Sequence, residues 1–269
     1  MDALSSQSAL SGYAAVLLGA THLGRVLPKV TTAAGTIGPA KVLVLGLGVA
    51  GLEAVATAQR LGAVVESYDV RPATQEQALS LGATFVDTGV DATGKGGYAR
   101  ELTSAEKSTV DAALTQHIQT ADLVITTAAI PDRPSPKLVT RAQVAGMKSG
   151  AVIVDLSAEG GGNCEASRPG ETVQVGEVTI VAPLNVPATL AADGSALYAS
   201  NLFHFLELIL KDNVLKLDWK DDILAQTVLT HDGKLDPVPA PHAQNAGAAV
   251  PAQASSQRRP RQPSVGSSK

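Results

Sequence analysis

Residues 41–69 read KVLVLGLGVAGLEAVATAQRLGAVVESYD, and this stretch is the most informative part of the chain for its architecture. The aliphatic run at 41–45 predicts a buried strand, a glycine-rich turn follows it, and a helix is expected to about Leu61. A second aliphatic run, 63–68, predicts another strand and leads to Asp69. A strand, a helix and a strand in this order indicate two parallel strands joined by a crossover helix. The sequence therefore predicts an α/β fold with a doubly wound parallel sheet of the Rossmann type.

The turn carries three glycines at the spacing of a dinucleotide-binding site. Gly46 permits a tight turn, Gly48 lets the backbone approach a pyrophosphate, and Gly51 lets the helix pack closely on the strand. The helix N-terminus offers unpaired N–H groups and a partial positive charge to the phosphates. Asp69 follows about 20 residues later, where a carboxylate accepts hydrogen bonds from the adenosine ribose. We predict a dinucleotide pocket; the alternative is a glycine turn that serves packing alone.

The composition fits such a fold and excludes several classes of protein. Of the 269 residues 45% are hydrophobic and 3% aromatic, so the core is built from aliphatic side chains. The single cysteine, Cys164, excludes an intrachain disulfide framework, and we expect its thiol to be inert. The longest apolar run, near residues 202–210, is far shorter than the roughly 20 residues that cross a bilayer. The net charge of −4 argues against nucleic acid as a partner.

Helix and strand patterns continue on both sides of this stretch. Apolar spacing predicts an amphipathic helix at 9–23, and small residues predict a loop at 31–39. Thr74 and Gln77 predict a capping box at the start of a helix. Further strands are predicted at 84–86, 122–126, 151–155 and 178–182, and further helices at 74–81, 104–119, 138–147 and 195–211.

The last third of the chain differs in character from the rest. Residues 214–217 and 223–229 predict a small hairpin-like piece. We expect a dinucleotide-binding domain at 1–194, followed by a helix and short strands at 195–236. Residues 237–269, rich in proline and alanine without periodicity, predict a disordered tail or linker.

A second glycine-rich segment, residues 87–100, comes close to a phosphate-binding P-loop. Its residues 89–96 read GVDATGKG. Gly96 stands where that motif requires the serine or threonine that holds magnesium, and no helix pattern opens there. We therefore reject an NTPase and expect a mobile loop that carries Tyr98.

The strand at 122–126 is followed by Thr127, Ala128 and Ala129. Ligands of open parallel sheets lie beyond the carboxyl ends of the strands, at the point where the strand order reverses. We therefore expect these three residues near the cofactor. The histidines are scattered, and the sequence has neither an HExxH motif nor paired cysteines, so we predict no metal site.

Four motifs together resemble one protein family. Residues 41–77, GGYARE at 96–101, TTAAIPDRPSPKLVT at 126–140 and VIVDLSAEGGGNCE at 152–165 are similar to the NAD(H)-binding alpha subunits of proton-translocating NAD(P) transhydrogenases. The likeness covers about residues 1–230. Alanine dehydrogenase, which shares the same type of C-terminal domain, is the more distant relative.

The resemblance implies a division of labour between subunits. This chain would bind NAD(H), a partner subunit would bind NADP(H), and hydride would pass directly between the two nicotinamides. Membrane-spanning subunits or segments would couple the transfer to proton translocation. The protein's task is then orientation, which needs neither a nucleophile nor a metal. The resemblance also implies a homodimer at the cytoplasmic face of an inner membrane, or on the matrix side in a mitochondrion.

The resemblance also implies roles for individual residues. The pyrophosphate would lie against Gly46, Gly48, Val49, Ala50 and Gly51. Asp69, followed by Val70 and Arg71, would hold the adenosine ribose and repel a 2′-phosphate. Binding of NADP instead of NAD stays an alternative, because Arg71 is near and an arginine can accommodate that phosphate.

The other half of the coenzyme would meet a second group of residues. Thr127, Ala128 and Ala129 would face the nicotinamide ribose, and the loop with Tyr98 would close over the nucleotide. Glu159 stands where alanine dehydrogenases carry an active-site carboxylate, and we expect a structural role for it here.

The chain departs from the family at its start. Asp2 and Ser5 match the end of a loop that orients the nicotinamide, whereas the family's preceding arginine and glutamine are absent. We expect a chain truncated at its N-terminus, lacking a half-domain on which residues 195–236 would pack. We expect it to bind NADH more weakly than a full subunit and to transfer hydride poorly.

Two other functions stay open from the sequence. The first is an alanine dehydrogenase-like amino-acid oxidoreductase, which would need a lysine and a histidine from the missing half. The second is an NAD-binding module without catalytic turnover.

Overall fold

The computed structural model describes residues 1–94, 99–130 and 133–235. It contains two compact units, Met1–Leu206 and a second that begins at Glu207. Helix α6 (Ala191–Ile209) begins in the first unit and ends in the second. Tyr98 and the predicted tail at 237–269 lie outside the described residues.

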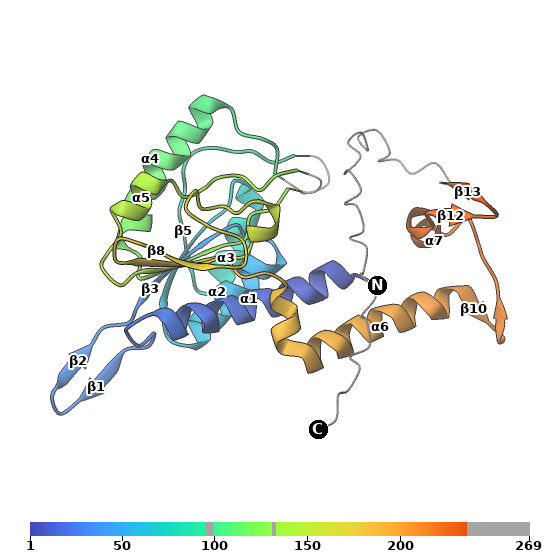
Figure 1. Cartoon of the computed structure of the whole chain (residues 1–269), viewed down its shortest axis with the longest axis horizontal. Coiled ribbons are helices and arrows are strands. Elements are labelled where there is room, and N and C mark those ends of the chain that lie inside the picture. Colours follow the sequence, from blue (N-terminus) through green and yellow to red (C-terminus); the bar gives the residue numbers. More distant parts are fainter. Residues whose placement is uncertain (95–98, 131–132, 236–269) are drawn as a thin grey trace, which may run out of the picture. The chain divides into compact units, whose positions relative to one another are not determined.

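A seven-stranded sheet forms the centre of the first unit (Figure 1). Its order is β5-β4-β3-β6-β7-β9-β8, and all neighbours pair in parallel except β8 and β9. The strands are β3 (Lys41–Leu45), β4 (Val64–Tyr68), β5 (Thr84–Phe85), β6 (Leu123–Thr126), β7 (Val152–Asp155), β8 (Thr172–Val175) and β9 (Val178–Val181). From β3 the chain proceeds first to β4 and β5 and then returns to β6 on the other side. The topological switch point therefore lies between β3 and β6, which confirms the predicted Rossmann-type fold.

Helices cover both faces of the sheet (Figure 1). Val42 and Val44 of β3 join a core cluster with α1 (Ala3–His22) and α2 (Val49–Arg60). Leu43 and Leu45 alternate to the other face, where they pack with α4 (Ser104–Thr120) and α5 (Arg141–Ala145). The aliphatic strand is buried on both faces, as the sequence predicts for a central parallel strand.

Helix α1 approaches α2 closely because its contact face is built from small residues. Gly12, Ala15, Val16 and Gly19 are its buried residues. A Cβ on Gly12 would collide with the carbonyl oxygen of Ala50, in the first turn of α2. The middle of α1 therefore packs against the first turn of α2, directly after the glycine turn.

Several boundaries predicted from the sequence are wrong. Helix α1 begins at Ala3, ahead of residue 9, because Asp2 caps it. The expected loop at 31–39 contains a hairpin of β1 (Val30–Thr32) and β2 (Gly35–Ile37). Strand β8 has no counterpart in the prediction.

Two predicted helix starts are also wrong. Thr74 belongs to the 3₁₀ turn η1 (Pro72–Thr74), and its hydroxyl donates to Arg71 O at 2.9 Å, so it forms no capping box for α3 (Gln75–Ser80). The helix expected at 138–147 shortens to α5, which starts after a capping box formed by Thr140 and Gln143. Further 3₁₀ turns are η3 (Ala158–Gly160) and η4 (Val186–Leu190).

The second unit consists of short elements. It contains the end of α6, the hairpin of β10 (Leu210–Lys211) and β11 (Val214–Leu215), α7 (Asp222–Thr227), and the hairpin of β12 (Thr230–His231) and β13 (Lys234–Leu235). The prediction of an extended segment at 223–229 is therefore wrong. Asp221 caps α7 by accepting hydrogen bonds from the backbone N–H groups of Ile223 and Leu224.

Candidate functional site

A cavity of about 800 Å³ opens at the carboxyl ends of β3, β4 and β6. This is the edge of the sheet at which the strand order reverses. Most of the residues predicted for the site line it: Ser5, Gly46, Gly48, Val49, Ala50, Asp69, Val70, Arg71, Thr127, Ala128 and Ala129. Asp2 and Gly51 are not among the lining residues, and Tyr98 lies outside the described part of the chain.

The glycine turn has the conformation that its spacing predicts. Gly46 has a φ of +98°, and a Cβ there would lie 2.9 Å from Ala128 N. A Cβ on Gly51 would collide with the carbonyl oxygen of Gly46, so Gly51 permits the close contact between α2 and the turn. A Cβ on Gly48 would meet no atom within 4 Å, since it would point into open space. Gly46 and Gly51 therefore permit close packing, and Gly46 and Gly48 line the cavity.

The first turn of α2 leaves its backbone donors available. Gly48 is the N-cap residue and supplies no side-chain hydrogen bond. The first N–H groups of a helix have no partner within the helix, and together with the helix dipole they attract anions. Val49 and Ala50 belong to this turn and line the cavity. The arrangement suits a phosphate group.

Asp69 lies across from this turn, with its side chain 7% exposed. Its Oδ2 accepts a hydrogen bond from Leu47 N at 2.7 Å, which ties the carboxylate to the glycine turn. Its Oδ1 accepts from the backbone N–H of Arg71 at 2.9 Å and from Arg71 Nε at 2.8 Å. The predicted acid and the predicted arginine therefore form one unit at the end of β4.

The Thr127–Ala129 segment forms the wall on the other side of the turn. Thr127 donates its hydroxyl to Gly46 O at 2.9 Å. Ala128 is held by the side chain of Asn163, which no sequence pattern singled out. Asn163 is fully buried behind the wall, and the sequence offers only its position in a glycine-rich loop as a signal.

Asp2 and Ser5 have separate positions at the start of α1. Asp2 Oδ1 accepts a hydrogen bond from Ser5 N at 2.9 Å, so Asp2 acts as the helix cap. The hydrogen bonds from Ser5 lower the pKa of the Asp2 carboxyl. Ser5 itself lines the cavity.

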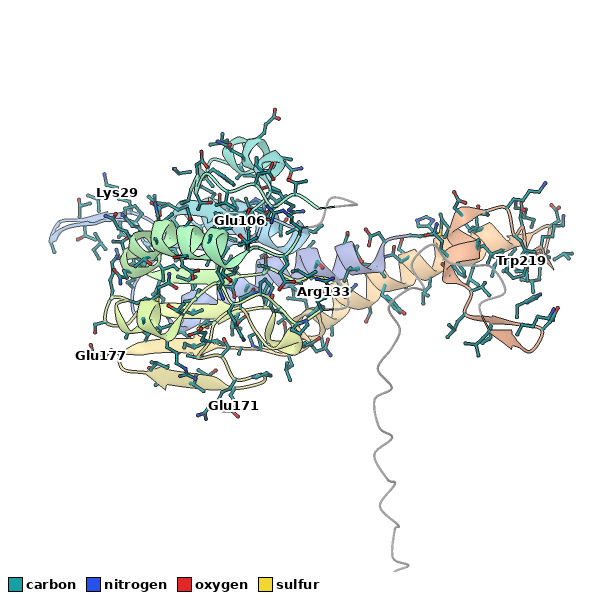
Figure 2. The ribbon with its side chains drawn as sticks, turned by 90° about the horizontal axis from the view of Figure 1, so that it is seen from above. Lys29, Glu106, Arg133, Glu171, Glu177 and Trp219 are labelled. Carbon is teal, nitrogen blue, oxygen red and sulfur yellow. The ribbon has the colours of Figure 1, made fainter. Side chains whose placement is uncertain are left out.

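Charged residues that the prediction left out also line the cavity. They are Arg100, Glu101, Lys107, Asp111, Arg133 and Lys137, and Figure 2 labels Arg133. Lys137 Nζ donates to the carbonyl oxygens of Gly161 and Gly162 at 2.5 and 2.8 Å, which braces the loop that follows β7. Burial raises the pKa of Asp111.

Two other residues considered in the sequence analysis, Glu159 and Cys164, do not line the cavity. Glu159 accepts a hydrogen bond from Asn185 N at 2.9 Å, which fits a structural role. Cys164 is buried, and burial raises the pKa of its thiol. Across residues 1–94, 99–130 and 133–235, no cluster of histidine, cysteine, aspartate or glutamate could hold a metal ion. Within the same ranges no helix is both long and apolar enough to cross a bilayer.

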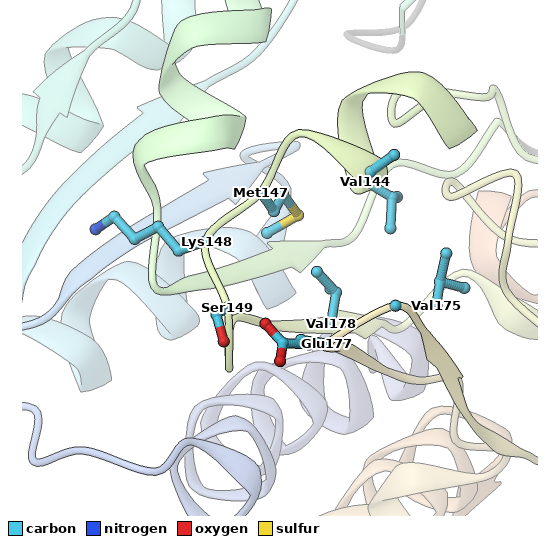
Figure 3. Close-up of a pocket in the computed structure, with 9 residues that line it drawn as sticks. Val144, Met147, Lys148, Ser149, Val175, Glu177 and Val178 are labelled. Carbon is cyan, nitrogen blue, oxygen red and sulfur yellow. The ribbon is translucent and has the colours of Figure 1, made fainter.

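A smaller cavity of about 230 Å³ lies between α5 and the turn from β8 to β9 (Figure 3). Val144, Met147 and Val178 give it an apolar wall. Lys148 also lines it, but its ammonium pairs with Asp122 at 2.9 Å. No residue predicted for the site contributes to this cavity.

The chain matches the family model described as alanine dehydrogenase/PNT, C-terminal domain, over residues 15–237. It is 48% identical over 244 residues to an NAD(P) transhydrogenase alpha subunit of Rhodospirillum rubrum, covering 87% of this chain and 63% of that relative. It is 31% identical over 245 residues to alanine dehydrogenase of Mycolicibacterium smegmatis, covering 86% of this chain and 60% of that relative. The crystal structure of transhydrogenase from Sinorhizobium meliloti is similar with a TM-score of 0.77 and 47% identity, over 87% of this chain and 63% of that one. The chain thus spans less than two thirds of the length of each of these relatives.

Proposed function

The chain belongs to the family of alanine dehydrogenase/PNT C-terminal domains, and on this basis we propose that it is the NAD(H)-binding component of an NAD(P) transhydrogenase. Its higher identity to a transhydrogenase alpha subunit than to an alanine dehydrogenase, 48% against 31%, supports that choice.

The observation that carries the proposal is the glycine turn and Asp69 on one cavity at the switch point of the sheet. The turn exposes backbone N–H groups at the start of α2, with Gly48 open toward the cavity. Asp69 lies at the end of the neighbouring strand. A pyrophosphate on the turn would place the adenosine ribose at Asp69, as in other dinucleotide-binding sheets. The cavity volume of about 800 Å³ lies within the range of small-molecule pockets.

The two halves of the coenzyme would lie on opposite sides of the turn. Gly46, Gly48, Val49 and Ala50 would hold the pyrophosphate, and Asp69 with Val70 and Arg71 the adenosine end. Because β6 pairs with β3 on the side away from β4, Thr127, Ala128 and Ala129 would contact the nicotinamide end. Ser5, capped by Asp2, would orient that end from α1.

The residues of the chain would act by orientation alone. The bound nicotinamide supplies the hydride chemistry. The chain would hold the ring at contact distance from a second nicotinamide, with its face aligned and water excluded. The proposed closing role of Tyr98 concerns a residue outside the described part of the chain.

The rest of the assembly is also part of the proposal. A partner subunit would bind NADP(H), and membrane-spanning subunits or segments would couple hydride transfer to proton translocation, with the chain peripheral to the membrane. We propose a homodimer. The exposed apolar side chains of Leu202 and Leu206, 48% and 47% exposed, support packing of residues 195–236 on a further half-domain.

The alternative of an amino-acid oxidoreductase rests on the alanine dehydrogenase relative. That alternative gains no support from Glu159, whose carboxylate is engaged with Asn185. A non-catalytic NAD-binding module is the other alternative.

One experiment separates the three functions. The chain is combined with an NADP(H)-binding transhydrogenase subunit, and hydride exchange between NADH and oxidised NADP is followed by chromatographic separation of the NADPH formed, because NADH and NADPH absorb alike. The proposal predicts exchange that depends on both proteins, and no oxidation of L-alanine. Saturable NADH binding without exchange would contradict the transhydrogenase role and favour the module. Alanine oxidation would favour the dehydrogenase.

A further inference from the structure

We propose that Asn163 is a positioning residue that sets the shape of the cavity wall on the β6 side, the side that would take the nicotinamide end of the coenzyme. The inference rests on the proposed function for the identity of the ligand. The hydrogen bonds by which Asn163 holds the cavity wall, called the clamp below, are present in the structure without any ligand.

One amide side chain holds two segments of the wall. Asn163 Oδ1 accepts a hydrogen bond from Ala128 N at 3.0 Å. Its Nδ2 donates to Ala128 O at 2.8 Å and to Pro136 O at 2.8 Å. Ala128 and Pro136 both line the cavity, whereas Asn163 is completely buried behind them. The side chain of Asn163 therefore acts on a ligand through these two residues.

The strand hydrogen bonds stop just where this clamp begins. Thr127 N donates to Leu45 O at 2.9 Å and so continues the register between β3 and β6. The backbone of Ala128 is held by side chains instead, namely Asn163 and the Ser157 hydroxyl, which donates to Ala128 O at 2.9 Å. The loop after β7 thus takes over from the sheet in fixing the wall.

Asn163 is itself fixed by its surroundings. Its backbone oxygen accepts hydrogen bonds from Leu138 N at 2.7 Å and Val139 N at 3.1 Å. Asp155, fully buried at the end of β7, holds the same loop at both ends. It accepts from Ser157 N at 3.1 Å and from Cys164 N at 3.0 Å. A side chain locked in this way can hold a wall within the small tolerance that a binding site requires.

The chemistry of the clamp requires an amide. Asparagine offers an acceptor for Ala128 N and two donors for the oxygens of Ala128 and Pro136. An aspartate would lack both donors, and an aliphatic residue would leave Ala128 N and Pro136 O without this partner and Ala128 O with the Ser157 hydroxyl alone. Leaving such groups unpaired favours a shift of the wall toward water in the cavity.

The strand order decides which half of the ligand would respond. Asp69 follows β4 on one side of the glycine turn, and Ala128 follows β6 on the other. A ligand that ends at the pyrophosphate, such as ADP, would contact the β4 side and the turn. NADH would in addition reach the wall that Asn163 holds. Comparing ADP with NADH therefore separates a local shift of the wall from general loosening of the protein.

The test compares Asn163→Ala with wild type in the full 269-residue chain, with NADH and ADP titrated separately. We expect NADH affinity to fall at least about tenfold and ADP affinity to change by less than about twofold. Gln143→Ala is the matched control, because Gln143 is also a buried amide, 4% exposed, but its amide donates to Asp111 O and Thr115 Oγ1 of α4 and accepts from Thr140 at the start of α5. We expect this control to leave the ratio of NADH to ADP affinity unchanged.

The outcomes against the inference are distinct from those against the proposed function. Unchanged NADH affinity in a folded Asn163→Ala protein, or an equal loss for ADP, would overturn the positioning role. Wild type that binds ADP but not NADH would overturn the proposed function and the inference with it. If Asn163→Ala does not fold, Ser157→Ala decides, since it removes a single donor to Ala128 O. A NADH-selective loss of about threefold supports the inference, and no selective loss overturns it.

Discussion

The carboxylate of Asp69 and the guanidinium of Arg71 form a bidentate ion pair at the end of β4. Arg71 Nε lies 2.8 Å from Oδ1, and Nη2 lies 2.8 Å from Oδ2. The pair is largely buried, with side-chain exposures of 7% for Asp69 and 20% for Arg71. Arginine is therefore present at the place where a 2′-phosphate would lie, but its charge is balanced by the acid. Coenzyme selectivity should depend on Asp69 keeping that balance.

Asp69→Asn tests this relationship. The substitution keeps the size of the side chain but removes the charge that would hold the ribose diol and repel a 2′-phosphate. A hydrogen bond to a charged group contributes about 1.5–3 kcal/mol, so we expect NADH affinity to fall at least about tenfold. NADPH affinity should rise, because Arg71 is released from the carboxylate. Fluorescence titration with both coenzymes measures the ratio.

The double variant Asp69→Asn/Arg71→Gln is the control. It should lose the gain in NADPH affinity while NADH binding stays weak. A ratio of NADH to NADPH affinity that stays at the wild-type value in Asp69→Asn would show that this acid does not set selectivity.

Gly48 and Gly51 provide a matched pair of alanine substitutions in one turn. A Cβ at Gly48 enters open space, and the residue has a φ of −76° that alanine adopts readily. We expect Gly48→Ala to keep the melting temperature of wild type but to weaken NADH binding at least about tenfold, because the methyl group occupies the phosphate's approach. Calorimetric titration and thermal melting measure the two effects.

Gly51→Ala should lower the stability of the fold. Its Cβ would collide with the carbonyl oxygen of Gly46 and lie 3.1 Å from Thr127 Oγ1. Overpacking of this kind costs about 1–3 kcal/mol, which lowers the melting temperature by several degrees. A Gly48→Ala protein that binds NADH as tightly as wild type would contradict the placement of the pyrophosphate.

Tyr68 predicts an unusual response to a conservative change. Its side chain is 2% exposed, and its hydroxyl makes no hydrogen bond of normal geometry within the described residues, although the Thr88 side chain lies close enough to favour its ionised form. Tyr68→Phe should therefore leave stability at pH 7 unchanged or raise it by up to about 1 kcal/mol, since a buried hydroxyl without a partner is unfavourable. Urea unfolding measures the difference. A clear loss of stability would show that the hydroxyl has a partner.

The same residue predicts a dependence on alkaline pH. Burial raises the pKa of Tyr68 to about 12 from the ordinary 10. The folded state then holds its proton after the unfolded chain has lost it, so stability falls as the pH rises from 10 toward 12. Tyr68→Phe should remove this part of the alkaline loss. If the stability of wild type and of Tyr68→Phe fell equally with rising pH, Tyr68 would not contribute to the alkaline loss.

Glu106 predicts a response at acid pH. Hydrogen bonds from Arg100, then from Thr103, lower the pKa of Glu106 to about 2 from the ordinary 4.5. A lowered carboxyl pKa adds stability that is complete above pH 4.5 and is lost as the pH falls toward 2. The difference in melting temperature between wild type and Glu106→Gln should therefore shrink below pH 4.5. The difference should also shrink with added salt, because the ion pair between Arg100 and Glu106 is partly accessible to solvent. A difference that is constant with pH would refute this role.

The fold was predictable where several signals coincide. In residues 41–69 the aliphatic run, the glycine spacing and the following acid all point to one unit, and the structure contains it as β3, α2 and β4. Strand β8 was missed although Val173 and Val175 alternate with polar residues, because the alternation covers only four residues, the minimum for such a pattern. The hairpin of β1 and β2 was not predictable because five of its six residues are exposed, so no hydrophobic pattern marks it.

The site was predictable only in its local parts. Gly48, Asp69 and the Thr127–Ala129 segment lie at strand ends, and parallel order alone brings them to one edge. Asn163 was not predictable, because its function depends on a contact with Ala128 across 35 positions of the chain. The residues just before it are glycines, which give no hydrophobic pattern. The role of Asn163 can be recognised only from the folded structure, in which its loop lies behind the cavity wall.

NADH is proposed to bind between the glycine turn and Asp69, and a two-dimensional NMR titration of the full chain with NADH decides whether it does. We expect saturable shifts of the backbone amides of Gly48, Val49, Asp69 and Ala128. Amides at the second cavity, such as that of Val178, should stay in place. Absence of any saturable shift at the turn, or shifts confined to the second cavity, would refute this placement of the coenzyme.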